Sequence, residues 1–350
     1  GMVLAIPGAG KSFTVKQEIG QVYVGTKDDL LVVDPQNEYF EICEDWGGQV
    51  IDLSVETPHR MNPFELPPKE KVPSFHGFVA SQAEFAVALV HSVMQGNTTA
   101  YHSSVVERCT RLMYAEVKES WKSPTMMDLQ RWLQAQEGKY MQYAKDILVA
   151  MEPFTEGSLN IFAQETNVEI KNRFTVFGLA KLESNLRKPA MLVMINFINN
   201  RVEYNSKQGV ATWLWCDEFH VLTEDEVQTK EMEKCFKVFR KKGGIVTGIT
   251  QNVADMLQCK ETRTMISNCE YLCLLKQANL DRDLLDEVME VSYAQLKRVT
   301  NNPIGTGLVK FGEKIIAFDN RISKKNYLYS IFNTNLHEKI EQGFVGNTPV

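Results

Sequence analysis

Short apolar runs alternate with segments of helical spacing over most of this chain. The runs are typical of buried parallel strands, because they are apolar on both faces rather than on alternate positions. Turn residues or charged residues bound most of them. The pattern predicts strands at Met2–Ile6, Asp29–Val33, Gln49–Leu53, Phe174–Phe177, Ala211–Cys216, Ile245–Ile249 and Tyr271–Leu275, and an edge hairpin at Gly307–Phe311 and Lys314–Phe318.

The stretch between about 81 and 152 has a different period. Its apolar residues recur every three or four positions, as in Phe85, Leu89 and Val93, and no strand pattern interrupts them. A proline-rich segment, 66–73, precedes the stretch and is typical of a boundary. We therefore expect an α/β domain at 1–70 and 171–350, with a mostly parallel sheet covered by helices on both faces, and an inserted all-α subdomain at 71–170.

Composition narrows the class of protein. The chain has 350 residues, of which 44% are hydrophobic and 23% charged, and this balance is that of a globular protein. No apolar run reaches the roughly 20 residues of a membrane span. The seven cysteines form no CxxC pair, which predicts reduced thiols. A net charge of -6 lowers the expectation of tight nucleic-acid binding without excluding it.

The strongest chemical signal follows the first predicted strand. The sequence Pro7-Gly8-Ala9-Gly10-Lys11-Ser12 lies between a strand and a helix, which is the context of a phosphate-binding P-loop. Lys11 is expected to contact the β- and γ-phosphates of ATP, and the Ser12 hydroxyl to bind Mg²⁺. Ala5 replaces the first glycine of the usual motif and fits if its φ stays negative. The alternative is a glycine-rich turn with an incidental lysine.

An acidic pair, Asp217-Glu218, follows the most apolar predicted strand. We expect that strand to lie beside the P-loop strand. Asp217 would then hold the Mg²⁺ shell, and Glu218 would act as the general base toward water. The alternative is an acidic pair that caps a strand end. Lys11, Asp34, Asp217 and Gln251 each follow a strand, so parallel strands would bring all four to one edge of the sheet.

Five further residues are candidates with an open alternative. Gln251 is expected either to sense the γ-phosphate or to start a helix. Arg240 and Lys241 supply an arginine finger to a neighbouring subunit or interact with the end of their own helix. Asp34 and Glu38 approach the metal and water or shape a turn.

Several of these runs together resemble the conjugation ATPases of type IV secretion systems. The runs are GMVLAIPGAGKSF, VVDPQNEY, GGQVIDL with NPF, LWCDEFH, FRKKGGIVTGITQNVADML and GTGLVKFGEKIIAF. They are similar to the VirB-four (TraC/TraE-type) class in the HerA–FtsK branch of RecA-like P-loop ATPases. The resemblance implies a C-terminal motor domain with a RecA-like fold. It also implies ATP and Mg²⁺ as cofactors, with nucleotide contacts from Pro7, Gly8, Ala9, Gly10, Lys11, Ser12 and Phe13.

The resemblance also implies a setting. It implies ATP hydrolysis that powers channel or pilus assembly and substrate passage, at the cytoplasmic face of the bacterial membrane and together with other secretion components. A Gly1 that resembles a tag remnant suggests a fragment of a longer protein. A hexamer is expected for the full-length protein, and a monomer is the alternative for the fragment. Two rival functions remain open: a DNA-translocating coupling protein, and a non-hydrolysing scaffold.

Overall fold

A single large sheet forms the centre of the molecule. The computed structural model describes residues 1–334, apart from 55, 158–159, 224–225, 252–255, 257–259, 279–284, 286–294 and 296–298. In this part of the chain nine strands hydrogen-bond in the order β3-β4-β2-β5-β6-β1-β7-β8-β9. Their bounds are β1 Met2–Leu4, β2 Asp29–Asp34, β3 Gln49–Asp52, β4 Phe174–Gly178, β5 Thr212–Cys216, β6 Gly244–Thr250, β7 Tyr271–Leu274, β8 Thr306–Phe311 and β9 Lys314–Asp319.

The strand pairing confirms a mostly parallel α/β sheet. The pairs from β3 to β7 are parallel, and β8 and β9 add an antiparallel hairpin at one edge, as the sequence predicts. One expectation was wrong. The strand before Asp217, β5, does not pair with the P-loop strand β1, because β6 lies between them. The P-loop at the end of β1 and the acidic pair at the end of β5 are therefore separated by one strand, and the end of β6 lies between them.

The central strands are apolar on both sides because both faces of the sheet are covered. Along β2, Leu31 and Val33 face one hydrophobic core while Leu30 and Val32 face the other. All four side chains are fully buried. A continuous apolar run is the pattern expected of a strand between two layers. The predicted strands agree with the observed ones to within two residues at each end.

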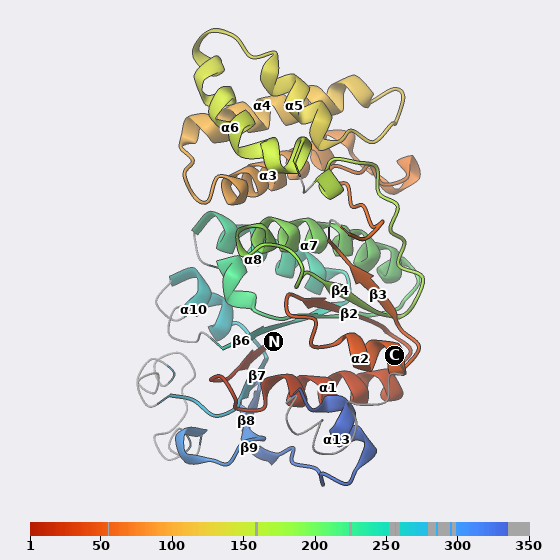
Figure 1. Cartoon of the computed structure of the whole chain (residues 1–350), viewed down its shortest axis with the longest axis vertical. Helices are drawn as coiled ribbons and strands as arrows, with labels where there is room; N and C mark the ends of the chain where they lie inside the picture. Colours follow the sequence, from red (N-terminus) through yellow and green to blue (C-terminus); the bar gives the residue numbers. More distant parts are fainter. Residues whose placement is uncertain are drawn as a thin grey trace, which may run out of the picture.

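Helices form a layer on each side of the sheet (Figure 1). One face carries α1 (Lys11–Gly25), α2 (Phe40–Asp45) and α13 (Tyr327–Phe332). The other carries α7 (Ser184–Lys207), α8 (Glu226–Lys241) and α10 (Lys260–Ser267).

The chain between β3 and β4 is helical, as its period predicts. It contains α3 (Phe75–Val93), α4 (Ala100–Val117), α5 (Met126–Gln134) and α6 (Met141–Thr155), with short 3₁₀ turns at Lys69–Lys71, Gly138–Tyr140 and Asn160–Phe162. Figure 1 shows these helices as a further layer beyond α7 and α8. Their buried residues belong to the same hydrophobic core as those between the sheet and α7. Division into two domains at 70 and 170 stays a prediction.

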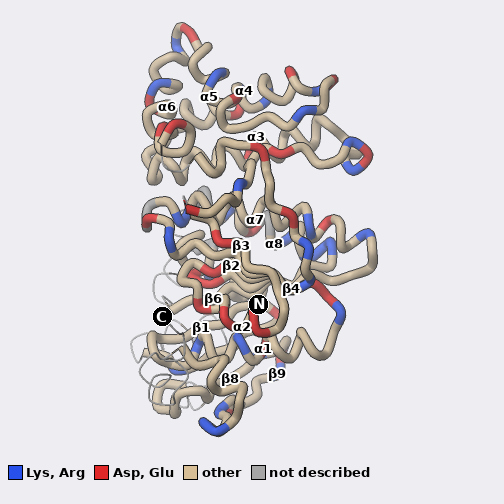
Figure 2. Tube along the Cα trace, turned by 45° about the vertical axis from the view of Figure 1, so that its right-hand side comes forward, with Lys and Arg blue, Asp and Glu red and all other residues tan. Residues whose placement is uncertain are grey.

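Charge is mixed over the surface of the molecule. Figure 2 shows Lys and Arg interspersed with Asp and Glu over both the helical layer and the sheet layers. Among the described residues no helix is both long and apolar enough to cross a membrane. The described cysteines, at 43, 109, 216, 269 and 273, are free thiols, in agreement with the sequence.

Candidate nucleotide-binding site

The P-loop connects the end of β1 to the start of α1 and leaves room for an anion. Gly8 and Gly10 have φ of 75° and 85°, which glycine adopts without a steric cost. A Cβ added at Gly8 would meet no protein atom within 4 Å. No side chain caps the first turn of α1, and that turn contains no acidic residue. The backbone N–H groups there suit a phosphate.

Ala5 fits the backbone in place of the usual glycine. It is fully buried in the core between the sheet and α1, and its N–H donates to the Thr250 carbonyl at 3.2 Å. Its φ does not lie in the left-handed region that favours glycine. Alanine therefore fits at position 5, because its φ stays negative as the sequence analysis requires.

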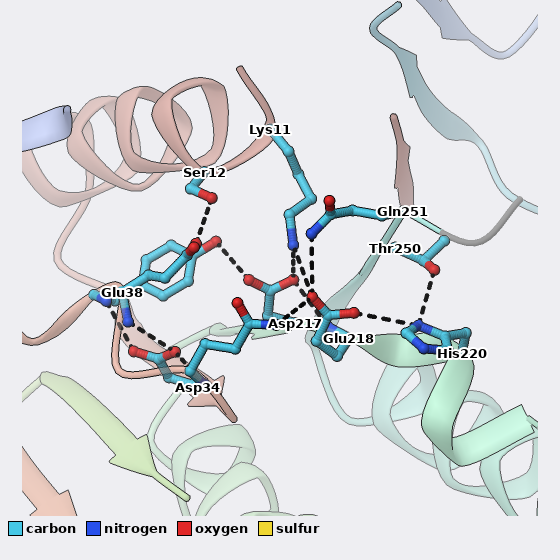
Figure 3. A network of polar contacts seen from close by, with 11 residues as sticks. Lys11, Ser12, Asp34, Glu38, Asp217, Glu218, His220, Thr250 and Gln251 are labelled. Atoms are coloured by element: carbon cyan, nitrogen blue, oxygen red, sulfur yellow. Dashed lines mark hydrogen bonds and ion pairs between the residues drawn. The ribbon is translucent and has the colours of Figure 1, made fainter. Parts of the chain in front are cut away.

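Lys11 connects the P-loop to the acidic pair (Figure 3). Its Nζ lies 2.5 Å from Asp217 Oδ1 and 3.5 Å from Glu218 Oε1, and all three side chains are almost fully buried. Burial alone would lower the pKa of Lys11, but the two carboxylates outweigh burial and raise it. Lys11 is thus a charged ammonium group held at the place where the two motifs meet.

Glu218 has a backbone conformation that non-glycine residues rarely adopt. Its φ is 49°, and its N–H donates to Asp217 Oδ1 at 2.8 Å. A left-handed non-glycine residue costs of order 1–3 kcal/mol and persists only where the surrounding structure holds it in place. The turn after β5 therefore accepts strain in order to point the Glu218 side chain toward the P-loop.

Three neighbours surround the Glu218 carboxylate. Gln251, at the end of β6, donates its Nε2 to Oε1 at 3.2 Å. Gln36, which the sequence did not single out, donates to the same oxygen at 2.9 Å. His220 Nδ1 lies 3.4 Å from Oε2 and 3.2 Å from Thr250 Oγ1. The structure thus brings Gln251 to the acidic pair; the alternative role of Gln251 as a helix cap involves residues outside the described part of the chain.

Asp34 shapes the turn that follows β2. Its carboxylate accepts the backbone N–H groups of Gln36 at 3.3 Å, Glu38 at 3.1 Å and Tyr39 at 2.8 Å. The buried Tyr39 hydroxyl donates in turn to Asp217 Oδ2 at 3.3 Å. These bonds favour the turn-shaping alternative for Asp34. Burial, with the nearby Asp217 charge, raises the pKa of Asp34 to about 7 despite the three amides.

The raised pKa of Asp34 predicts a pH dependence of stability. Asp34 binds its proton more tightly in the folded chain than in the unfolded one, so its contribution to stability is present below pH 4 and is lost as the pH rises through about 7. Asp34→Asn removes this titration. We expect the unfolding free energy of the wild type, relative to that of Asp34→Asn, to fall between pH 5 and pH 8 in urea denaturation. A constant difference over that range would contradict the prediction.

Ser12 and Glu38 form a second contact between the P-loop and the turn after β2. The Ser12 hydroxyl donates to Glu38 Oε2. Mg²⁺ commonly takes one or two protein oxygens, with water and phosphate oxygens completing an octahedron. The Ser12 hydroxyl and the Asp217 carboxylate fit this donor set. The described residues hold no cluster of three or more acidic, His or Cys ligands, as a dedicated protein cage would require.

A cavity of about 550 Å³ lies against the P-loop. Its far wall comes from a segment that the sequence did not connect with the site. Gly305 N–H donates to the Ala9 carbonyl at 3.4 Å, and Gln17 Nε2 donates to the Asn320 carbonyl at 3.0 Å. The lining comprises Gly8, Gly10, Lys11, Ser12, Phe13, Glu38 and Gln251 on one side and Ile304, Gly305, Asn320, Arg321, Ile322, Lys324, Tyr329, Asn333 and Thr334 on the other.

Arg240 and Lys241 do not approach the site of their own chain. They end α8, directly before β6 begins, whereas Gln251 follows the end of β6. They therefore lie at the opposite edge of the sheet. Arg240 forms an exposed ion pair of 3.0 Å with Glu270. Both alternatives for these residues, the finger for another subunit and the helix end, stay open.

Comparison with solved structures shows the same fold. VirB4 of Thermoanaerobacter pseudethanolicus has a TM-score of 0.79 and 23% identity, over 92% of this chain and 89% of that one. The plasmid coupling protein TrwB in complex with ADP and Mg²⁺ has a TM-score of 0.66 and 13% identity, over 92% and 85%. TrwB with a non-hydrolysable ATP analogue gives 0.63 and 13%, over 93% and 87%.

Sequence comparison gives the family. No curated protein matches the chain significantly. The family model described as the TraG P-loop domain matches residues 1–300. This match, with the fold likeness to VirB4, confirms the resemblance to the conjugation ATPases. The chain therefore belongs to the TraG P-loop domain family.

Proposed function

We propose that the chain is an ATP-hydrolysing motor domain that powers conjugative or type IV secretion. One observation carries the proposal: the P-loop Lys11 lies 2.5 Å from Asp217 and 3.5 Å from Glu218, beside a cavity large enough for a nucleotide. Family membership and the nucleotide complexes of TrwB, which has the same fold, support this function.

Each residue of the site has a role in this proposal. The uncapped start of α1 and the P-loop amides bind the phosphates, and Lys11 exchanges its carboxylate partners for the β- and γ-phosphates. Ser12 and Asp217 would hold Mg²⁺, which when bound neutralises charge on the transferred phosphate. Glu218 takes the proton of the attacking water while the bond to the leaving ADP oxygen breaks.

The geometry around Glu218 favours hydrolysis over a scaffold role. A scaffold needs phosphate ligands but no oriented base. Here the carboxylate sits on a strained backbone and accepts hydrogen bonds from Gln36 and Gln251. Hydrogen bonds that fix the orientation of one carboxylate are useful for activating water, because a general base must point at the proton that it takes.

The decisive experiment measures Mg²⁺-dependent phosphate release from ATP by the purified chain, alone and with single- or double-stranded DNA. Turnover that is abolished by EDTA and unchanged by DNA supports the proposed ATP-hydrolysing motor. A strong stimulation by DNA would instead favour the coupling-protein alternative. Tight ATP binding without any phosphate release would support the scaffold and overturn the proposal.

We further propose that the domain works at the cytoplasmic face of the bacterial membrane, with other secretion components as partners. Family membership supports this setting. The acidic net charge and the mixed surface of Figure 2 give no specific support to direct DNA binding. A hexamer is part of the proposal.

Assembly predicts a concentration dependence that Arg240 controls. The Arg240 side chain is 76% exposed, and its surface pair with Glu270 is worth about 0–1 kcal/mol, so it is free to reach a neighbouring subunit. Specific activity should rise with protein concentration in the wild type and stay flat in Arg240→Ala, because a finger stabilises transition-state charge. ATP affinity should be nearly unchanged.

The matched control for this experiment is Arg111→Ala. Arg111 also pairs with a surface glutamate, Glu107, but it lies in the helical layer. The control should show the same rise as the wild type. If Arg240→Ala still shows the rise, the trans-acting role of Arg240 is wrong and its interaction with the end of α8 remains.

A further inference from the structure

The turn after β2, residues 34–39, contacts both the P-loop and the acidic pair. Gln36 donates to Glu218 Oε1 at 2.9 Å, and the Tyr39 hydroxyl donates to Asp217 Oδ2 at 3.3 Å. Glu38 accepts the Ser12 hydroxyl. Three side chains of one turn thus reach three different residues of the P-loop and the acidic pair, as Figure 3 shows for Glu38 and its neighbours.

The turn is rigidly fixed at its base. The Asp34 carboxylate accepts three backbone N–H groups of the turn, those of Gln36, Glu38 and Tyr39, and Asp34 itself is fully buried at the end of β2. A side chain carried by such a turn has a defined direction. Gln36 is exposed to solvent on its outer side, yet its amide points inward to Glu218.

We propose that Gln36 is a positioning residue for hydrolysis, which holds the Glu218 carboxylate in the orientation that accepts the proton of the attacking water. This inference rests on the proposed ATPase function. Gln36 and Gln251 both donate to Oε1, from the ends of two strands on opposite sides of β5. Two amide donors fix this oxygen, and His220 Nδ1 lies 3.4 Å from Oε2, so that the plane of the carboxylate is defined.

The same turn couples this orientation to the phosphate site. Glu38 and Gln36 lie two residues apart, and they contact Ser12 and Glu218 respectively. The Ser12 hydroxyl would bind Mg²⁺ through its oxygen and can keep donating its proton to Glu38, so the metal position would be linked to the turn that carries Gln36. Gln36 itself donates to Glu218, whose proposed role is in the chemical step, so losing its amide is expected to lower kcat more than ATP affinity.

The test compares Gln36→Met with the wild type in steady-state ATP hydrolysis. Methionine keeps the length and volume of the side chain but removes the amide donor. Because misplacing a catalytic group costs up to about a hundredfold, we expect kcat to fall roughly ten- to a hundredfold while KM and the Kd for ATP change less than about threefold. Gln36→Ala should show the same loss. Gln208→Met, at an exposed glutamine after α7, should match the wild type.

A double variant separates positioning from a merely structural role. In single-turnover measurements, Gln36→Met should reduce the rate much less in a Glu218→Gln background than in the wild type, because both changes remove the same function. Wild-type kcat in Gln36→Met, or the same fold-loss in both backgrounds, would overturn the inference. The proposed function would survive either result, since it fails only if the wild type itself does not hydrolyse ATP.

Discussion

Replacing Lys11 by alanine is expected to abolish ATP hydrolysis and to weaken ATP binding by about ten- to a hundredfold. A hydrogen bond to a charged group contributes about 1.5–3 kcal/mol, and Lys11 provides the cation at the start of α1 that can reach the β- and γ-phosphates. Binding is measured by fluorescence titration with a labelled ATP analogue, and turnover by phosphate release.

Loss of Lys11 also leaves Asp217 and Glu218 buried without their cation, which threatens stability. Lys11→Arg serves as the second variant, because it keeps the charge while its planar guanidinium replaces a point charge. We expect Lys11→Arg to fold, as judged by circular dichroism, and still to hydrolyse ATP poorly. Lys145→Ala, an exposed lysine of α6, is the control. Wild-type turnover in Lys11→Ala would refute the P-loop assignment.

The second large effect is expected for Glu218→Gln. Removing a general base costs about 10²–10⁴ in rate, so kcat should fall by at least about a hundredfold. ATP should still bind with nearly wild-type affinity, because Lys11, Ser12 and Asp217 stay in place. Glutamine also keeps an oxygen that can accept from Gln36 and Gln251.

The control for this change is Glu137→Gln, an exposed glutamate between α5 and α6. It should leave both binding and turnover unchanged. If Glu218→Gln cannot bind ATP, Glu218 has a structural role. The strained turn after β5 then shapes the nucleotide cavity and does not position a catalytic base.

Local sequence patterns predicted the elements of this fold well. Strands such as β2 have a continuous apolar run, residues 30–33, because both of their faces are covered, and that signal lies within the strand itself. The P-loop and the acidic pair were also identified locally. Their contact, Lys11 with Asp217, follows from the shared edge of a parallel sheet.

The errors concern relations between distant segments. Apolarity does not encode which strand lies beside which, so the position of β6 between β1 and β5 was not predicted. Gln36 was missed because a single glutamine in a turn has no pattern, and its role depends on Glu218 across the sheet. The cavity wall around Gly305 and Tyr329 was missed for the same reason.

The central place of β1 determines when the phosphate site can form during folding. Met2 pairs with Gly248 on one side and with Leu272 on the other, so its neighbours are separated from it by most of the chain. Closing such long loops is slow, and non-local pairing delays folding. The P-loop is continuous in sequence, but its supporting strand has no partner until β6 and β7 have been made. ATP binding is therefore a late-acquired property of the nascent chain, available only once the middle of the sheet has closed.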